Sequence, residues 1–179
     1  MTILQRWDSP KKAMKKLLLL DADVITDLHT LDLFDRIIKT YDVHVTRTVL
    51  GEARYFKKEG RREKISIADK VTVVDVEPES LNRVRIEARE AQLGIDPGEL
   101  ESIAYLNTTE EDLLFSTCDK AAITLFSYME LETKSISVEK AVRGAGHHTK
   151  NLYPRHYEKM FQKCIGKGKA LRIQFKTLT

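Results

Sequence analysis

The sequence has few cysteines and lacks the long apolar runs and internal repeats that define several classes of protein. It holds only two cysteines, Cys118 and Cys164, far apart and outside any CxxC pair, which argues against a disulfide framework and against a structural zinc site. No apolar run is long enough to cross a membrane, and no signal-peptide core precedes the first apolar segment. Internal repeats and low-complexity linkers are also missing. We therefore expect a cytoplasmic protein with a single core.

Charge is unevenly distributed along the 179 residues. The whole chain carries a net charge of +3. Residues 140–179 hold ten Lys or Arg against the single acid Glu158, so this segment carries +9 and residues 1–139 carry −6. We predict a domain core over 1–139 and a basic helical extension over 140–179. An acidic body with a basic tail suits a protein that holds a metal in one part and a polyanion in the other; the alternative is a solvated lysine-rich helix.

Short apolar runs alternate with segments of helical spacing. Strands are predicted at 16–20, 43–46, 71–76 and 113–118. Helices are predicted between them: one with an apolar stripe over 28–38 that ends near Tyr41, a second over 49–56, a third over 79–92 and a fourth over 99–107. The alternation predicts an α/β fold, a central parallel sheet covered by helices on both faces. A hinge at 144–154 leads to a C-terminal helix that ends near 166–168.

Acidic residues follow these predicted elements in a fixed order. They are Asp21 after the first strand, Glu52 on the second helix, Glu99 and Glu101 at the start of the fourth, and Asp119 after the last strand. Because ligands of open α/β sheets bind beyond the carboxyl ends of the strands, Asp21 and Asp119 should emerge at one edge. Carboxylates gathered there repel each other unless they hold a hard divalent cation such as Mg²⁺ or Mn²⁺. The order of acids predicts a metal site for phosphate chemistry.

These residues and their flanks resemble the PIN domain. The matching pieces are Asp21-Ala-Asp23-Val-Ile after a leucine strand, Val45-Thr46 leading to Glu52, Gly98-Glu99-x-Glu101, and Ser116-Thr117-Cys118-Asp119, within about 17–137. The resemblance implies a Rossmann-like three-layer α/β/α sandwich and a Mg²⁺- or Mn²⁺-dependent ribonuclease that cleaves RNA. Many members are toxins of toxin–antitoxin pairs, so an antitoxin and a second copy of the chain are the protein partners it implies.

The resemblance assigns roles to the acids one by one. Asp21 matches the family's first acid, Glu52 its second and Asp119 its last. For the third acid, Glu99 occupies the Gly-Glu position of one branch, while Glu101 has the spacing before Asp119 of the common toxin branch. Residues two apart on a helix point about 200° apart. Both stay candidates, with Glu101 favoured as the ligand and Glu99 as helix-start acid or second ligand.

Two further residues support the site by the same resemblance. Thr117 matches the hydroxyl residue before the last acid, where it can hydrogen-bond a carboxylate or a metal-bound water. Asp23 replaces a residue that is usually small and polar in the family. It either adds charge to the site or caps the following helix, and the cap is favoured. Because no second acid closely follows Asp119, the number of metal ions stays open.

Three functions are compatible with these residues. A bound divalent metal lowers the pKa of a water and neutralises charge on a phosphodiester, so a nuclease needs no covalent nucleophile. A PIN-like domain can also lose catalysis and serve as an RNA-binding module. Asp21 and Asp23, two apart after a strand, further resemble the haloacid-dehalogenase phosphatases. That family requires a downstream Lys and a later acidic pair, which the sequence does not clearly provide.

The extension mixes basic and aromatic residues. Arg155, Lys159 and Lys163 interleave with aromatic rings, which suits contact with the backbone and bases of single-stranded RNA. We predict that these three residues bind nucleic acid. Alternatively, the apolar side chains from Tyr157 to Phe161 dock the helix on the body. The histidines at 147, 148 and 156 have no acid or Cys at ligand spacing, so phosphate contact or solvent exposure is expected for them.

Overall fold

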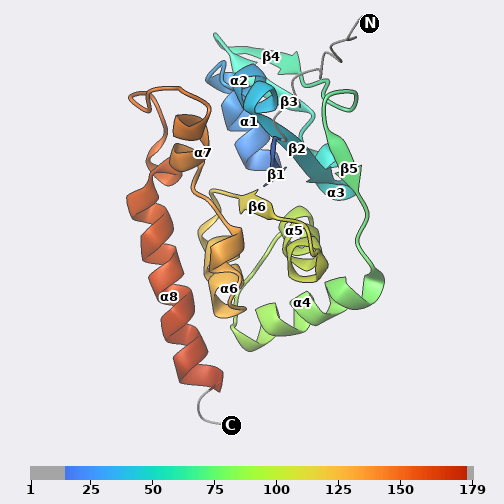
Figure 1. Ribbon diagram of the computed structural model, residues 1–179, viewed down its shortest axis with the longest axis vertical. Coiled ribbons are helices and arrows are strands. Elements are labelled where there is room, and N and C mark those ends of the chain that lie inside the picture. Colours follow the sequence, from blue (N-terminus) through green and yellow to red (C-terminus); the bar gives the residue numbers. More distant parts are fainter. Residues whose placement is uncertain (1–14, 177–179) are drawn as a thin grey trace, which may run out of the picture.

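The computed structural model describes residues 15–176. It is an α/β fold with a central four-stranded parallel sheet flanked by helices and with a long C-terminal helix along one side (Figure 1). The strand order is β5-β2-β1-β6, and all three neighbouring pairs are parallel. The strands are β1 Lys16–Leu20, β2 Tyr41–Thr46, β5 Thr72–Val74 and β6 Leu113–Ser116. The predicted parallel sheet is confirmed.

Helices fill the connections between these strands. They are α1 Ala22–Thr30, α2 Phe34–Thr40, α3 Arg47–Glu52, α4 Pro78–Glu90, α5 Pro97–Thr108, α6 Lys120–Tyr128, α7 Val138–Gly144 and α8 Glu158–Lys176. Two short 3₁₀ turns are η1 Glu132–Lys134 and η2 Pro154–His156. A separate antiparallel hairpin consists of β3 Tyr55–Lys58 and β4 Arg61–Lys64. No helix within residues 15–176 is long and apolar enough to span a lipid bilayer.

The leucines of β1 explain how the sheet is packed. Successive side chains of a strand point to opposite faces. Leu18 and Leu20 are buried in a hydrophobic cluster with α1, α2, α3 and α7, whereas Leu19 is buried in a second cluster with α4, α5, α6 and α8. Burying each of these side chains stabilises the fold by roughly 1.5–3 kcal/mol. The central strand thus joins two cores.

Two predicted helices are wrong in extent. The helix expected to run to Tyr41 is two helices, α1 and α2, because the chain turns at Asp32, whose φ of 55° lies in the left-handed region. The helix expected over 49–56 ends at Glu52, and Phe56 lies in strand β3 instead. The hairpin that follows was not predicted.

The C-terminal helix is longer than predicted. It continues through Gly166 and Gly168 to Lys176. Gly168 lies where α8 crosses α6, and a Cβ there would collide with the carbonyl oxygen of Thr124. The glycine therefore marks a close helix contact rather than a helix end.

The segment after residue 140 packs against the rest of the chain. Phe161, Cys164 and Ile165 of α8 are buried against α6, and Ser127 Oγ donates a hydrogen bond of 2.8 Å to the Ile165 carbonyl oxygen. The predicted division at 139/140 stays a prediction. In the folded chain, α8 shares a core with α6.

Candidate functional site

The carboxyl ends of β1 and β6 place Asp21 and Asp119 at one edge of the sheet. These strands are direct neighbours, with Leu20 opposite Ser116. Thr117 links the two acids: its hydroxyl donates to Asp21 Oδ2 at 3.4 Å and accepts the Asp119 backbone N–H at 3.1 Å. The predicted placement of Asp21 and Asp119 at one sheet edge agrees with the structure, and Thr117 hydrogen-bonds a carboxylate, one of the two contacts expected for it.

Asp119 also begins a helix. It is the N-cap of α6, and its Oδ1 accepts the backbone N–H of Ala122 at 2.8 Å. This bond satisfies one of the unpaired donors of the first helical turn. Because the cap uses Oδ1, the second carboxylate oxygen remains for other partners.

Glu99 reaches the same edge from α5. It is buried, with 6% of its surface exposed, and its Oε2 accepts the Asp96 backbone N–H at 3.3 Å in a capping box. Burial raises the pKa of Glu99 to about 9, and the negative charges of Asp21 and Asp119 add to the rise. Glu99 is therefore electrostatically coupled to both strand-end acids.

Asp21 is the most deeply placed of these acids. Burial raises its pKa to about 7, against hydrogen bonds from the Ala22 backbone and Thr117, and the charges of Asp23 and Glu52 contribute to the rise. Within residues 15–176, no Lys, Arg or His forms a salt bridge with Asp21 or Glu99. Two buried carboxyl groups thus lack a protein cation.

Glu52 approaches the cluster from the end of α3. Its carboxylate lies over Gly98, where a Cβ would stand only 2.6 Å from Glu52 Oε2. A side chain at position 98 would therefore displace the Glu52 carboxylate from the start of α5. Partial burial raises the pKa of Glu52, and the charges of Asp96, Glu101 and Asp23 add to it. Glu52 forms the exposed rim of the site.

Glu101 has a different environment from Glu99. Its carboxylate accepts the Thr48 hydroxyl at 2.7 Å and the Thr48 backbone N–H at 3.3 Å. These bonds tie α5 to the first turn of α3. The placement favours Glu99 as the acid that acts with Asp21 and Asp119, whereas the sequence-based preference for Glu101 stays a prediction.

The predicted capping role of Asp23 is wrong. The N-cap of α1 is Asp21, and Asp23 lies inside the first turn. Its side chain is exposed, and its Oδ2 is 3.7 Å from Nη1 of Arg155. Asp23 therefore connects the C-terminal segment to the sheet edge at which Asp21 and Asp119 lie, here called the acidic edge.

A third buried acid, Asp27, was not predicted from the sequence. Arg155 binds its carboxylate through two nitrogens, with Nε to Oδ2 at 3.0 Å and Nη2 to Oδ1 at 2.7 Å. His156, fully buried, places Nε2 2.6 Å from Asp27 Oδ2. Since His156 Nδ1 accepts the Tyr153 backbone N–H at 3.2 Å, Nε2 carries the proton donated to Asp27. The expected solvent or phosphate contact of His156 is wrong, because an internal acid binds it.

The same cluster includes Cys118. Donor atoms of Asp27, Cys118 and His156 lie within 4.8 Å of one another, a spacing that could hold a metal ion. However, Arg155 already neutralises Asp27, and burial raises the pKa of the Cys118 thiol. A thiol binds metal as its thiolate. We interpret the cluster as a clamp for the C-terminal segment. The acids at the sheet edge, within residues 15–176, form no group whose donor atoms lie as close together as those of Asp27, Cys118 and His156.

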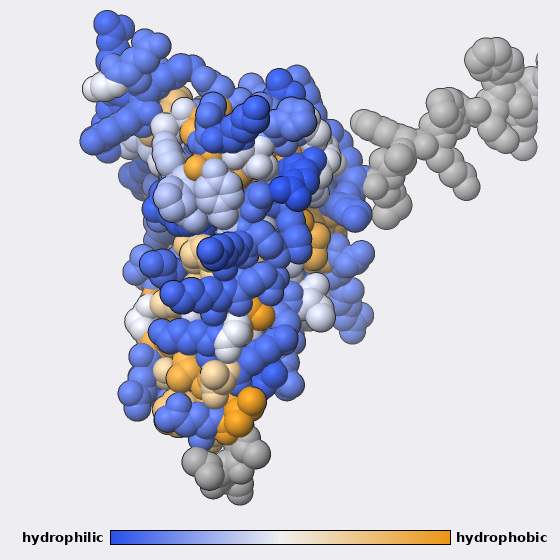
Figure 2. Space-filling model, turned by 90° about the vertical axis from the view of Figure 1, so that its left-hand side faces the viewer, coloured by the Kyte–Doolittle hydropathy of each residue, from blue (hydrophilic) through white to orange (hydrophobic). Residues whose placement is uncertain are grey.

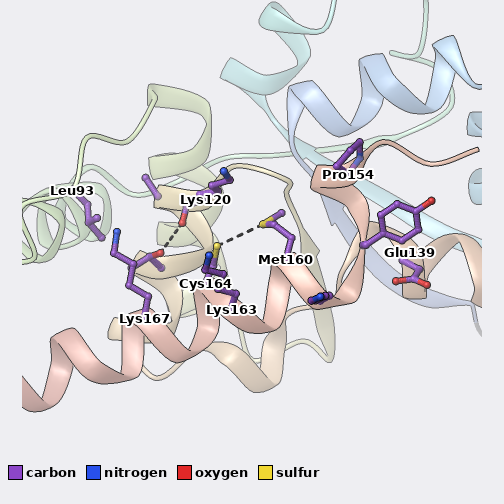
Figure 3. A pocket seen from close by; sticks show the side chains of 12 residues that line it. Leu93, Lys120, Glu139, Pro154, Met160, Lys163, Cys164 and Lys167 are labelled. Carbon is purple, nitrogen blue, oxygen red and sulfur yellow. Dashed lines mark hydrogen bonds between the residues drawn. The ribbon is translucent and has the colours of Figure 1, made fainter.

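A groove of about 1020 Å³ lies between α6 and α8. Figure 3 shows Lys120 of α6 near Met160, Lys163, Cys164 and Lys167 of α8. Lys159 also lines the groove, so α8 contributes lysines at four-residue spacing, on one helix face. Figure 2 shows that hydrophilic residues predominate on the side along which α8 runs, with small hydrophobic patches among them.

The groove begins beside the acidic edge, because Lys120 directly follows Asp119. None of its four lysines forms a salt bridge within the described part of the chain. Of the predicted nucleic-acid-binding residues, Lys159 and Lys163 line this groove, whereas Arg155 is engaged by Asp27. The groove combines a row of lysines with apolar side chains, and one acid, Glu139, also lines it.

The chain matches no model of a known protein family and no curated protein. We therefore infer the function from the geometry of the site and the order of its residues.

Proposed function

We propose that the chain is a Mg²⁺- or Mn²⁺-dependent endoribonuclease built on a PIN-like three-layer α/β/α sandwich. The observation that carries the proposal is the pair Asp21 and Glu99, two buried carboxyl groups with raised pKa values and no salt bridge to a cation of residues 15–176. Bringing like charges together out of water destabilises a fold unless a ligand compensates. A divalent cation is the compensation that suits oxygen donors.

The donor set fits such an ion. All candidate ligands are carboxylates, and the exposed rim at Glu52 gives access from solvent. Asp21, Glu99 and Asp119 would hold the ion, with Glu52 on the open side. Mg²⁺ normally keeps several waters, so a few carboxylates without a compact cage suffice. When bound, the ion supplies an activated water and neutralises charge on the phosphodiester.

RNA is the proposed substrate because of the lysine groove beside Asp119. Lys120, Lys159, Lys163 and Lys167 can neutralise successive phosphates, and the apolar side chains between them offer contact to bases. A cytoplasmic toxin that pairs with an antitoxin and forms a homodimer belongs to the same proposal, supported by the resemblance to the PIN domain alone.

The test uses the full chain with labelled single-stranded RNA in Mn²⁺, Mg²⁺ or EDTA, and with p-nitrophenyl phosphate in parallel. We expect RNA cleavage that requires the metal and no release of p-nitrophenol. Asp21→Asn, Glu99→Gln and Asp119→Asn should each lower the rate by roughly 100-fold or more. The matched control is Asp112→Asn, the same change at an exposed acid.

Two outcomes would replace this function by another. If RNA binds but is not cut in the presence of either Mn²⁺ or Mg²⁺, the protein is a non-catalytic RNA-binding module. Hydrolysis of p-nitrophenyl phosphate that disappears in Asp21→Asn indicates a phosphatase.

A further inference from the structure

The β3–β4 hairpin follows α3 and the acid Glu52 almost directly. Its two-residue turn, Glu59-Gly60, has positive φ at both positions, 49° and 78°, the pattern of the tight turns that match strand twist. The pairing is complete from Tyr55 opposite Lys64 to Lys58 opposite Arg61. The hairpin is thus a short arm of fixed register.

This register separates the side chains into two faces, because residues opposite each other in a pair share a face. One face, here called the open face, consists of Tyr55, Lys57, Arg62 and Lys64. The other, here called the packed face, consists of Phe56, Lys58, Arg61 and Glu63. Three of the four open-face residues are cations, and none is an acid.

The packed face attaches the arm to the body. The Phe56 ring lies 5.3 Å from the His29 ring, centroid to centroid. Lys58 Nζ lies 2.7 Å from Asp32 Oδ1, in the turn after α1. These contacts hold Phe56 and Lys58 against α1, while Arg61 and Glu63 of the packed face stay exposed, as the open face does.

The open face carries charge that the described residues do not neutralise. All four of its side chains are exposed, and Lys57, Arg62 and Lys64 form no salt bridge within residues 15–176. Lys57 stands directly opposite Arg62, and like charges in opposed positions destabilise a strand pair. Arg62 Cζ lies 3.9 Å from the centroid of the Tyr55 ring, so the two form a stacked cationic platform.

The base of the hairpin lies close along the chain to Glu52, while its packed face contacts the end of α1 that lies away from Asp21. A recess of about 410 Å³ at its base is lined by Tyr55 and Lys64 and by Leu50 and Ala53. The last two residues flank Gly51-Glu52 on α3. The three peptide units from Glu52 to Tyr55 span at most roughly 11 Å. Figure 1 shows the hairpin near one end of the molecule and the far end of α8 near the other.

We propose that the open face binds single-stranded RNA, with phosphates on Lys57, Arg62 and Lys64 and a base on the Tyr55–Arg62 platform. Stacking on an exposed aromatic ring requires an unstacked base, which favours a single strand over a duplex. The inference rests on the proposed function and extends it: the strand would contact the hairpin as well as the α8 groove.

The experiment compares two double variants that remove the same charge. Lys57→Ala/Arg62→Ala neutralises the open face, and the control Arg36→Ala/Arg61→Ala removes two exposed cations outside the open face and keeps the Lys58–Asp32 contact. Binding of a fluorescein-labelled single-stranded oligoribonucleotide of mixed sequence is measured by anisotropy in EDTA at several NaCl concentrations. Loss of two phosphate contacts should weaken binding roughly 20-fold at 0.1 M salt and lower the salt slope by roughly 1.4. The control variant should change both quantities much less.

Tyr55 has its own readout. Tyr55→Ala should weaken binding without changing the salt slope, and Tyr55→Phe should restore it, because stacking needs the ring and not the hydroxyl. A duplex of the same sequence should compete poorly. Mn²⁺-dependent hydrolysis of bis(p-nitrophenyl) phosphate, a small phosphodiester, should stay at the wild-type rate in the open-face variant.

Unchanged affinity and slope in the open-face variant, or an equal loss in both double variants, overturns the inference. Efficient competition by the duplex also overturns it. In these cases the proposed function stands if wild-type protein still cuts RNA with Mn²⁺. Conversely, RNA binding that depends on the open face in a protein that cuts nothing supports the inference and removes the nuclease function.

Discussion

Two buried aspartates, Asp21 and Asp27, stand at opposite ends of one short segment and have opposite surroundings. Both are almost fully buried, with 4% and 5% of their surfaces exposed. Asp27 receives hydrogen bonds from Arg155 and His156. Asp21 receives them from a threonine and the backbone, and its pKa rises to about 7 because of burial and neighbouring acids.

The comparison separates an acid that is paired with protein cations from an acid that has none among the described residues. A buried carboxylate needs a compensating charge wherever it lies. For Asp27 the C-terminal segment supplies that charge, so Asp27 fixes this segment to α1. For Asp21 no described side chain supplies it, and in the proposed function a divalent cation does.

The largest expected effect is on folding stability at Asp27. Asp27→Ala leaves the buried His156 N–H without an acceptor and frees Arg155, so we expect the free energy of unfolding to fall by about 3 kcal/mol. Asp21→Asn in EDTA should leave it unchanged or raise it, because it removes an uncompensated buried charge. Urea denaturation of both variants measures the difference, and equal losses would contradict the comparison.

The pH dependence should be next in size. The folded-state pKa values of Asp21 and Glu99, about 7 and about 9, exceed their ordinary values of 3.8 and 4.5. The folded protein therefore binds more protons than the unfolded chain. The contribution of this proton binding to the free energy of unfolding is complete below about pH 4 and is lost as pH rises towards 9. In EDTA, wild-type stability should fall over pH 6–9 by on the order of a few kcal/mol more than that of Glu99→Gln.

Metal should reverse this trend. Mn²⁺ binds the ionised carboxylates, so the rise in melting temperature that it causes should increase with pH. A rise that is independent of pH, or equal in wild type and Glu99→Gln, would place the metal elsewhere.

The smallest effect tests the choice between Glu99 and Glu101. If Glu101 mainly ties α5 to Thr48, Glu101→Gln should lower the free energy of unfolding by about 1 kcal/mol and RNA cleavage only a few-fold. Thr48→Val should then reproduce the stability loss. Cleavage by Glu101→Gln as low as that by Glu99→Gln would instead identify Glu101 as a ligand.

Local pattern was sufficient for the sheet and for the order of the acids. The leucine run of β1 and the apolar run of β6 predict buried strands because each turns neighbouring side chains into two cores. Since parallel strands end at one edge, the positions of Asp21 and Asp119 followed from these runs. Residues near the ends of strands are thus predictable from short-range periodicity.

The hairpin and the break between α1 and α2 at Asp32 were not predicted, because both form through local backbone conformation. Strands β3 and β4 carry charge on both faces and no apolar alternation, so their pairing depends on the Glu59-Gly60 turn and on Phe56 packing against His29. Positive φ at Asp32 likewise ends a helix that apolar spacing would continue. Hydrophobic periodicity contains no signal for either feature.

The sequence by itself determined the sheet strands and the order of acids along its edge, because those depend on neighbours within a few residues. Only the tertiary structure decided which acids receive a cation from the protein. Asp27 and Arg155 are 128 residues apart, and Glu99 differs from Glu101 only by which side of α5 faces the strand ends. Burial and charge pairing are properties of the packed chain, and they distinguish the clamp at Asp27 from the acidic site at Asp21.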